Sequence, residues 1–229
     1  MGQHRGNESR ESHEVKVSAI SRAFAEALLI GDEIAAELAI REALAAKLGQ
    51  GEIDDEIIAP ALWLIGELWE RGEISVADEH LATEISIRVL ALQREAQRMI
   101  RARADHRVML AAPSGEQHVV VLKMISDLLR EAAYDVLMLG GDVPAPALAE
   151  AARRHDADVI CLTSTMPGGA DRVLLAIHAV QEVRPGTGFI IGGRALTSRL
   201  RPRPGIAVCR RVSEVVDAVD AMVKRADQN

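Results

Sequence analysis

The sequence predicts an all-α segment followed by a doubly wound α/β domain, and two observations lead to this fold class. From Glu14 to Leu92, apolar residues recur at three- and four-residue spacing, as in amphipathic helices that pack into a bundle. After Arg107, short continuous apolar runs alternate with helical patterns, as in a parallel sheet covered on both faces. The charged stretch before Arg107 lacks an apolar face, so we place the boundary there, with a helical cap over residues 14–103 and an α/β domain over residues 104–229.

Composition and charge argue against several classes of protein. The chain has 229 residues, of which 48% are hydrophobic and 2% aromatic, so it can bury a sizeable aliphatic core. Its net charge of −7 argues against direct DNA binding, and no apolar run approaches the length of a membrane span. Cys161 and Cys209 lie in separate apolar runs, which indicates buried thiols and a cytoplasmic protein. Residues 1–13 are polar without periodicity and are expected to form a disordered tail.

Four helices are expected in the first segment, and they form a small antiparallel bundle because their links are short. The first ends at Gly31, and Asp32 can cap the second. The third begins near Asp54, contains a proline in its first turns and ends at Gly72. The fourth starts at a capping box in which Ser75 is followed three residues later by an aspartate.

The second segment contains five strand candidates and four helix candidates. Continuous apolar strands that alternate with helices predict a parallel sheet, and five of them suit a flavodoxin-like (Rossmann-like) order. Two prolines between Gly193 and Gly205 leave room for only a short helix there, or none. The expected strands cover residues 107–113, 135–140, 158–164, 188–192 and 206–210, and the expected helices cover residues 119–133, 145–155, 170–183 and 213–225.

The first strand is followed by the turn Gly115-Glu116-Gln117-His118, which is the strongest candidate for a functional site. The turn lies at the carboxyl edge of the expected sheet, where open α/β sheets bind ligands. Glu116 can hydrogen-bond one imidazole nitrogen of His118 and leave the other for a metal ion. The alternative is a histidine in a solvent-facing loop without a function.

Small and hydroxylated residues follow the third and fourth strands. Ser164 and Met166 belong to the loop after the third strand, and Gly192 and Gly193 follow the fourth. Small residues at these places leave a slot beside the sheet, although ordinary turns use the same residue types. No glycine-rich dinucleotide or phosphate-binding loop follows the first strand, so a metal-binding histidine beside a narrow slot is the expected arrangement.

These residues resemble the motif of cobalamin-binding domains, which carry an acidic residue two before a histidine, a Ser-x-Leu loop and a Gly-Gly pair on a flavodoxin-like sheet. By this resemblance His118 is the lower cobalt ligand, Glu116 orients it, and Ser164 and the glycine pair contact the nucleotide tail. Two positions depart from the motif. Val121 occupies a glycine position and narrows the slot, and Met166 replaces leucine.

The helical segment carries a second match. Trp69, at the end of the third helix, is followed after nine residues by Glu79 and His80 in the first turns of the fourth, so we expect the three at one end of a helical hairpin. The run LWERGEISVADEHLAT is similar to that of cobalamin-dependent photoreceptors (CarH-like), in which the tryptophan and the Glu-His pair surround the upper adenosyl ligand. Alternatively Trp69 packs in the core, but Trp63 points to another helix face and is the better candidate for that role.

The resemblance implies a light sensor that binds adenosylcobalamin and is not an enzyme. No DNA-binding domain precedes the first helix, so the expected output is a protein partner, a change of oligomeric state such as a homo-oligomer, or a domain outside this sequence. Related stand-alone sensors, the photocobilins, bind a bilin such as biliverdin as a second chromophore. Two alternatives stay open: a corrinoid carrier protein for methyl transfer, and a cobalamin-binding module without photochemistry.

Overall fold

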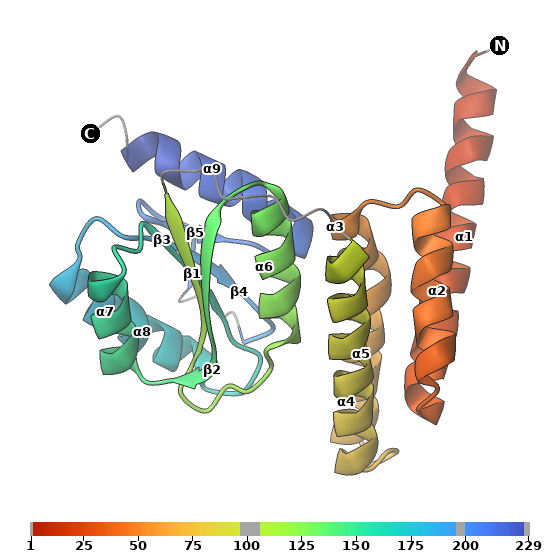
Figure 1. Ribbon diagram of the computed structural model, residues 1–229, viewed down its shortest axis with the longest axis horizontal. Coiled ribbons are helices and arrows are strands. Elements are labelled where there is room, and N and C mark those ends of the chain that lie inside the picture. Colours follow the sequence, from red (N-terminus) through yellow and green to blue (C-terminus); the bar gives the residue numbers. More distant parts are fainter. Residues whose placement is uncertain (1, 97–105, 196–199, 227–229) are drawn as a thin grey trace. The chain divides into compact units, whose positions relative to one another are not determined.

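The computed structural model describes residues 2–96, 106–195 and 200–226, and the chain forms two compact units (Figure 1). The helical unit spans Met1–Gln97 and the α/β unit spans Arg98–Asn229. The helical unit consists of α1 (Gly2–Ile30), α2 (Glu33–Ala45), α3 (Gln50–Ile53), the π-helical turn η1 (Asp54–Ile58), α4 (Ala59–Glu70) and α5 (Val76–Ala96). The expected helical cap is therefore confirmed.

The first helix is longer than the sequence pattern indicates. Residues 2–13, which we expected to be a disordered tail, belong to α1, so this prediction was wrong. The lack of an apolar stripe indicates that a segment is not packed in a core, but arginine, glutamate and glutamine still favour the helical conformation. At the end of this segment, His13 Nε2 lies 2.7 Å from Glu52 Oε1 of α3, which ties α1 to the next part of the bundle.

The expected helix signals act as predicted. The Asp32 side chain accepts the Ala35 N–H at 2.9 Å at the start of α2. At the start of α5, Asp78 N–H donates to Ser75 Oγ at 3.2 Å and the Asp78 carboxylate accepts the Ser75 N–H at 2.8 Å, which completes the capping box. The expected third helix is continuous from α3 to α4 but widens to a π-helical turn just before Pro60, which cannot donate a backbone hydrogen bond.

The α/β unit contains a five-stranded parallel sheet in the order β2-β1-β3-β4-β5, which confirms the flavodoxin-like prediction. Helices α6 and α9 cover one face of the sheet, and α7 and α8 cover the other (Figure 1). The elements are β1 (Arg107–Pro113), α6 (Val120–Glu131), β2 (Asp135–Val143), α7 (Ala145–Arg154), β3 (Val159–Thr163), α8 (Gly169–Val183), β4 (Gly188–Gly192), β5 (Ile206–Val208), η2 (Val212–Glu214) and α9 (Val215–Ala226).

Three strands end elsewhere than expected, and for β3 the difference is one residue, since it ends at Thr163. Strand β2 continues to Val143 through a register shift against β1, and this extension lies beside the turn that follows β1. Strand β5 stops at Val208, because the N–H groups of Arg210 and Arg211 donate to the Glu214 carboxylate, at 2.8 and 3.3 Å. The described parts of the link between Gly193 and Gly205 contain no helix, and residues 196–199 of that link lie outside the described residues.

The alternation of side chains assigns each strand residue to one face. Ile160 and Leu162 of β3 belong to a buried cluster with Val173 and Ile177 of α8. Because side chains alternate along a strand, Thr163 points to the opposite face, which α6 and α9 cover. The free thiols Cys161 and Cys209 are buried, as expected.

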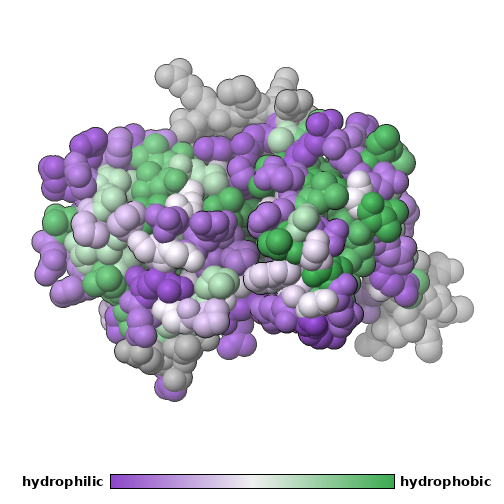
Figure 2. Space-filling model, turned by 90° about the horizontal axis from the view of Figure 1, so that it is seen from below, coloured by the Kyte–Doolittle hydropathy of each residue, from purple (hydrophilic) through white to green (hydrophobic). Residues whose placement is uncertain are grey.

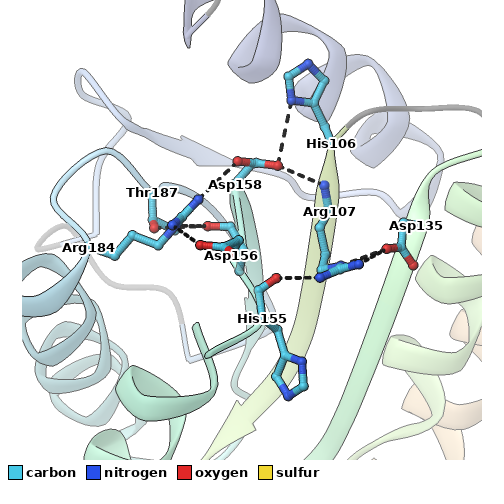
Figure 3. A network of polar contacts seen from close by, with 9 residues as sticks. His106, Arg107, Asp135, His155, Asp156, Asp158, Arg184 and Thr187 are labelled. Atoms are coloured by element: carbon cyan, nitrogen blue, oxygen red, sulfur yellow. Dashed lines mark hydrogen bonds and ion pairs between the residues drawn. The ribbon is translucent and has the colours of Figure 1, made fainter. Parts of the chain in front are cut away.

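A polar network joins the amino ends of the strands (Figure 3). The Asp158 carboxylate accepts the Arg107 N–H at 2.9 Å and lies 3.4 Å from the Arg184 guanidinium. The Arg107 side chain lies 2.7 Å from Asp135 of β2. These contacts hold three strands and the turn before β4 together at the edge opposite to the candidate site. No helix in the described part of the chain is long and apolar enough to cross a membrane.

Candidate functional site

The Glu116 side chain connects two loops at the carboxyl edge of the sheet. It lies in the turn between β1 and α6 and is fully buried, with 0% of its surface exposed. One carboxylate oxygen accepts the His118 N–H at 3.1 Å and also contacts His118 Nδ1. The other accepts the Ser164 hydroxyl at 3.2 Å and the N–H groups of Thr165 at 2.5 Å and Met166 at 3.0 Å. Glu116 therefore joins the loops that follow β1 and β3.

These contacts decide the charge of Glu116. Burial alone would raise the pKa of the carboxyl group, but the hydrogen bonds from His118, Thr165 and Met166 outweigh it and lower the pKa from 4.5 to about 2. The group is therefore a carboxylate at neutral pH. A carboxylate at this place accepts a hydrogen bond from the imidazole, so it favours the tautomer of His118 in which Nδ1 carries the proton.

The His118 side chain has the position that the sequence predicts. It follows β1 on the turn into α6, and 48% of its side chain is exposed. Because Nδ1 contacts the Glu116 carboxylate, Nε2 is the nitrogen whose lone pair can ligate a metal. The expected contact between Glu116 and His118 is thus present.

The glycine pair and Ser164 meet, but through the backbone. The Ser164 N–H donates to the Gly192 carbonyl at 3.1 Å. A Cβ atom at Gly193 would lie 2.2 Å from the Ser164 carbonyl oxygen, and one at Gly169 would lie 2.0 Å from its hydroxyl oxygen. Because glycine has no Cβ atom, the loop after β3 can pack closely against these two positions, and Ser164 can reach Glu116. Met166 joins the site through its backbone N–H, which donates to Glu116.

The end of β2 also contributes to the site, which the sequence pattern did not predict. The Asp142 carboxylate accepts the Gly115 N–H at 2.7 Å, and the Asp142 N–H donates to the Glu116 carbonyl at 2.8 Å. A Cβ atom at Gly141 would lie 2.8 Å from that same carbonyl oxygen, so only glycine fits. The Gly-Gly-Asp run at residues 140–142 could have indicated this contribution. Like the loops after the third and fourth strands, it places small residues at the carboxyl end of an expected strand.

The chemistry of this site suits a metal that a macrocycle already holds. Among the described residues, no three His, Cys, Asp or Glu side chains are grouped so that they could hold a metal ion. A single histidine cannot bind a bare ion firmly, but it can complete the coordination of a metal in a ring. Thr163 Oγ1, on the α6 side of the sheet, is buried with its residue only 2% exposed and has no hydrogen-bond partner among the residues that the structure describes. An unsatisfied hydroxyl beside the expected slot fits a ligand group that enters there.

The second group of candidate residues lies at the end of the hairpin formed by α4 and α5. Glu79 contacts its neighbour His80 at 2.7 Å through Nδ1 and accepts the Thr83 hydroxyl at 3.1 Å. The Trp69 side chain lies at the end of α4, where 40% of it is exposed. The hairpin therefore places the three at the same end of the helical unit, as the sequence predicts, and Trp69 is not a core residue.

The expectation for Trp63 was wrong. Trp63 is 52% exposed, more than Trp69, so neither tryptophan fills the core of the helical unit. The core is aliphatic with one buried aromatic, Phe24, and the face of α4 that packs inward carries Ala61 and Ile65 instead. Figure 2 shows hydrophobic surface on the helical unit, and its exposed large apolar residues include Leu29, Ile30, Ile34, Leu38, Trp63, Trp69 and Leu81.

Comparison with known proteins assigns both parts of the chain. A family model described as "B12 binding domain" matches residues 106–220, and a second model with the same description matches residues 20–93. The chain is 30% identical over 161 residues to the HTH-type transcriptional repressor CarH of Myxococcus xanthus, covering 69% of this chain and 50% of that protein. It is 25% identical over 167 residues to dimethylamine corrinoid protein 1 of Methanosarcina acetivorans, covering 71% of this chain and 78% of that protein.

Solved structures show the same fold. The monomethylamine corrinoid protein of Methanosarcina barkeri aligns with a TM-score of 0.69 at 16% identity, covering 86% of this chain and 94% of that one. The chain spans half the length of the CarH relative, so that protein has a further part without a counterpart in the alignment.

Proposed function

The chain belongs to the B12-binding domain family, and from this premise we propose that it binds adenosylcobalamin and acts as a light sensor. Three features support the cobalamin part of the proposal: the family match, the oriented His118, and a site that suits a metal held by a macrocycle. The light-sensing part rests mainly on one observation, the half-exposed Trp69 at the same hairpin end as the Glu79-His80 pair. Relatedness to CarH over 69% of this chain adds support.

In this proposal the residues of the α/β unit hold the lower face of the cofactor. His118 would ligate cobalt through Nε2, and Glu116 would keep the proton on Nδ1. Ser164, Gly192 and Gly193 would line the place of the nucleotide tail, with Thr163 Oγ1 as a further hydrogen-bonding group. Val121, in the first turn of α6, is partly buried and would set the width of that slot.

The residues of the helical unit would contact the upper face. The chemistry that the cofactor supplies when bound is a light-sensitive bond between cobalt and the carbon of its upper ligand. Trp69 would pack against that upper ligand, and Glu79 would hold the His80 imidazole in place through Nδ1. Once the ligand has left, His80 could approach the vacated position. The output would be a change of oligomeric state or a contact with a protein partner.

An absorption experiment tests this function. The purified protein is mixed with adenosylcobalamin, methylcobalamin or biliverdin, and spectra are recorded in the dark and after illumination. We expect binding of adenosylcobalamin, a stable change of its spectrum after light, and a different spectrum for His118→Ala in at least one of the two states. Spectra of the wild type and His118→Ala that coincide in both states would contradict the role of His118. A shift of the biliverdin spectrum would add a second chromophore.

A corrinoid carrier for methyl transfer is the second candidate. The similarity to dimethylamine corrinoid protein 1, which covers 78% of that protein, favours it. Such a carrier needs the lower ligand but has no need of Trp69 and the Glu79-His80 pair. Equal affinity for methylcobalamin and adenosylcobalamin, without a structural response to light, would favour the carrier over the sensor.

A further inference from the structure

Arg172 is a cation at the candidate site that the motifs do not include. It lies in the first turn of α8, directly after the loop that carries Ser164 and Met166. Its Nη2 donates to the Pro167 carbonyl at 3.2 Å. A Cβ atom at Gly115 would lie 3.7 Å from Arg172 Cζ, and one at Gly168 would lie 3.9 Å from its Nη1. The guanidinium therefore lies beside the turn of His118 and the loop after β3.

The hydrogen-bonding capacity of this guanidinium is mostly unused. A guanidinium has five N–H donors, and its one hydrogen bond to the described part of the chain is the bond to Pro167. Its Nε is buried and has no acceptor there. No described carboxylate forms an ion pair with it, whereas Arg184 at the opposite edge pairs with both Asp156 and Asp158. A buried donor without a partner is rare in folded proteins and calls for an explanation.

The place of Arg172 supplies that explanation. The carboxyl edge of a parallel sheet is where ligands bind, and a partly buried cation gains most from an acceptor oxygen that arrives with a ligand. We propose that Arg172 binds an oxygen of the corrinoid, either an amide carbonyl at the rim of the macrocycle or the phosphate of the nucleotide tail. This proposal rests on the proposed binding of cobalamin and does not depend on light sensing.

Affinity measurements with two corrinoids test the proposal. Cobinamide carries the amide-bearing macrocycle but lacks the phosphate and the lower base, so it separates the two sources of oxygen. We expect Arg172→Met to bind cobalamin about 10- to 100-fold more weakly than the wild type, because a hydrogen bond to a charged group is lost. An equal loss for cobinamide identifies the amide carbonyl, and an unchanged affinity for cobinamide identifies the phosphate.

Two controls keep the result specific. Arg153→Met removes an exposed arginine in the last turn of α7 and should bind both corrinoids like the wild type. If Arg172→Met melts at a lower temperature than the wild type, Arg172→Lys is measured instead. Lysine keeps the charge but loses the planar arrangement of donors, so an intermediate loss of affinity is expected.

The spectrum of the saturated variant separates contact from positioning. If Arg172 contacts the ligand, Arg172→Met at saturation should show the wild-type spectrum. Affinities within twofold of the wild type for both corrinoids would overturn the proposal. An altered spectrum at unchanged affinity would also overturn it, because Arg172 would then act through the turn of His118. A wild type that binds corrinoids but does not respond to light contradicts only the light-sensing function, whereas one that binds no corrinoid contradicts both.

Discussion

At the scale of single residues, one buried carboxylate holds the candidate site together. Glu116 receives hydrogen bonds from the loop after β1 and from the loop after β3, and three of its donors are backbone N–H groups, those of His118, Thr165 and Met166. An amide in its place could accept on one side only, because its NH2 group would face the N–H groups of Thr165 and Met166. The acidic residue is therefore required by the loops as well as by His118.

The lowered pKa of Glu116 predicts how the stability of the apo protein depends on pH. Since the pKa falls from 4.5 in the unfolded chain to about 2 in the folded protein, the ionised group stabilises the fold above pH 4.5. This contribution, about 3 kcal/mol, is lost as the pH falls from 4.5 to 2. Denaturant unfolding of the wild type and Glu116→Gln at several pH values measures it. We expect the variant to be less stable at pH 7 and the difference to shrink below pH 4.5.

Glu131→Gln is the matched control for this prediction. Glu131 is exposed at the end of α6, so its replacement should leave the free energy of unfolding within about 0.5 kcal/mol of the wild type at each pH. A difference between the wild type and Glu116→Gln that stays constant from pH 7 to pH 3 would contradict the assignment of the lowered pKa.

At the scale of elements, the end of β2 acts as a clamp on the turn between β1 and α6. Asp142 has a positive φ of 54° and bonds Gly115 through its side chain and Glu116 through its backbone. Asparagine tolerates this conformation and keeps an acceptor oxygen, whereas alanine does neither. We expect Asp142→Ala to lose about 1–3 kcal/mol of stability and to bind cobalamin more weakly, with Asp142→Asn close to the wild type. Thermal melting and titration with cobalamin measure both, and equal behaviour of the two variants would contradict the clamp.

The hairpin of α4 and α5 permits a paired test with its two tryptophans. Trp69 and Trp63 lie on the same helix and are both exposed, but only Trp69 lies at the end with Glu79 and His80. Trp69→Ala should therefore weaken the preference for adenosylcobalamin over methylcobalamin, whereas Trp63→Ala should preserve it.

Stability separates this outcome from a packing defect. Truncation of a buried tryptophan costs about 3–5 kcal/mol, and we expect a smaller loss for both variants because both side chains are partly exposed. A loss of that size for Trp69→Ala, with an unchanged ligand preference, would instead assign Trp69 to packing.

At the scale of the whole molecule, the sensor proposal predicts a response of the protein to light. A helical unit that closes around the upper ligand would lose packing contacts when that ligand leaves, at about 24 cal/mol for each cubic ångström of cavity. The closed arrangement should then become less stable than a shifted one. We expect the hydrodynamic radius of the adenosylcobalamin-bound protein to change on illumination, as measured by size-exclusion chromatography and small-angle scattering. The methylcobalamin-bound protein is the control. Profiles of the adenosylcobalamin-bound protein that coincide before and after complete photolysis would contradict the proposed rearrangement.

The sequence by itself determined the fold class and the order of the site elements. The boundaries of β1 and β4 were predicted to the residue, because continuous apolar runs that end in proline or glycine mark buried strands clearly. The turn of Glu116 and His118 was also predicted, since two residues of separation place both side chains on one short turn. Local patterns were sufficient for these features because they depend on neighbours along the chain.

Only the tertiary structure decided which distant residues complete the site. The contacts of Glu116 with Thr165, of Asp142 with Gly115 and of Gly193 with Ser164 join residues that are 27 to 49 positions apart and follow different strands. The helical state of residues 2–13 and the exposure of Trp63 were mispredicted for a related reason: the hydrophobic pattern of a segment does not show which neighbours it meets. The order of the strands in the sheet brings these loops to one edge, and that order places Arg172 beside the turn of His118.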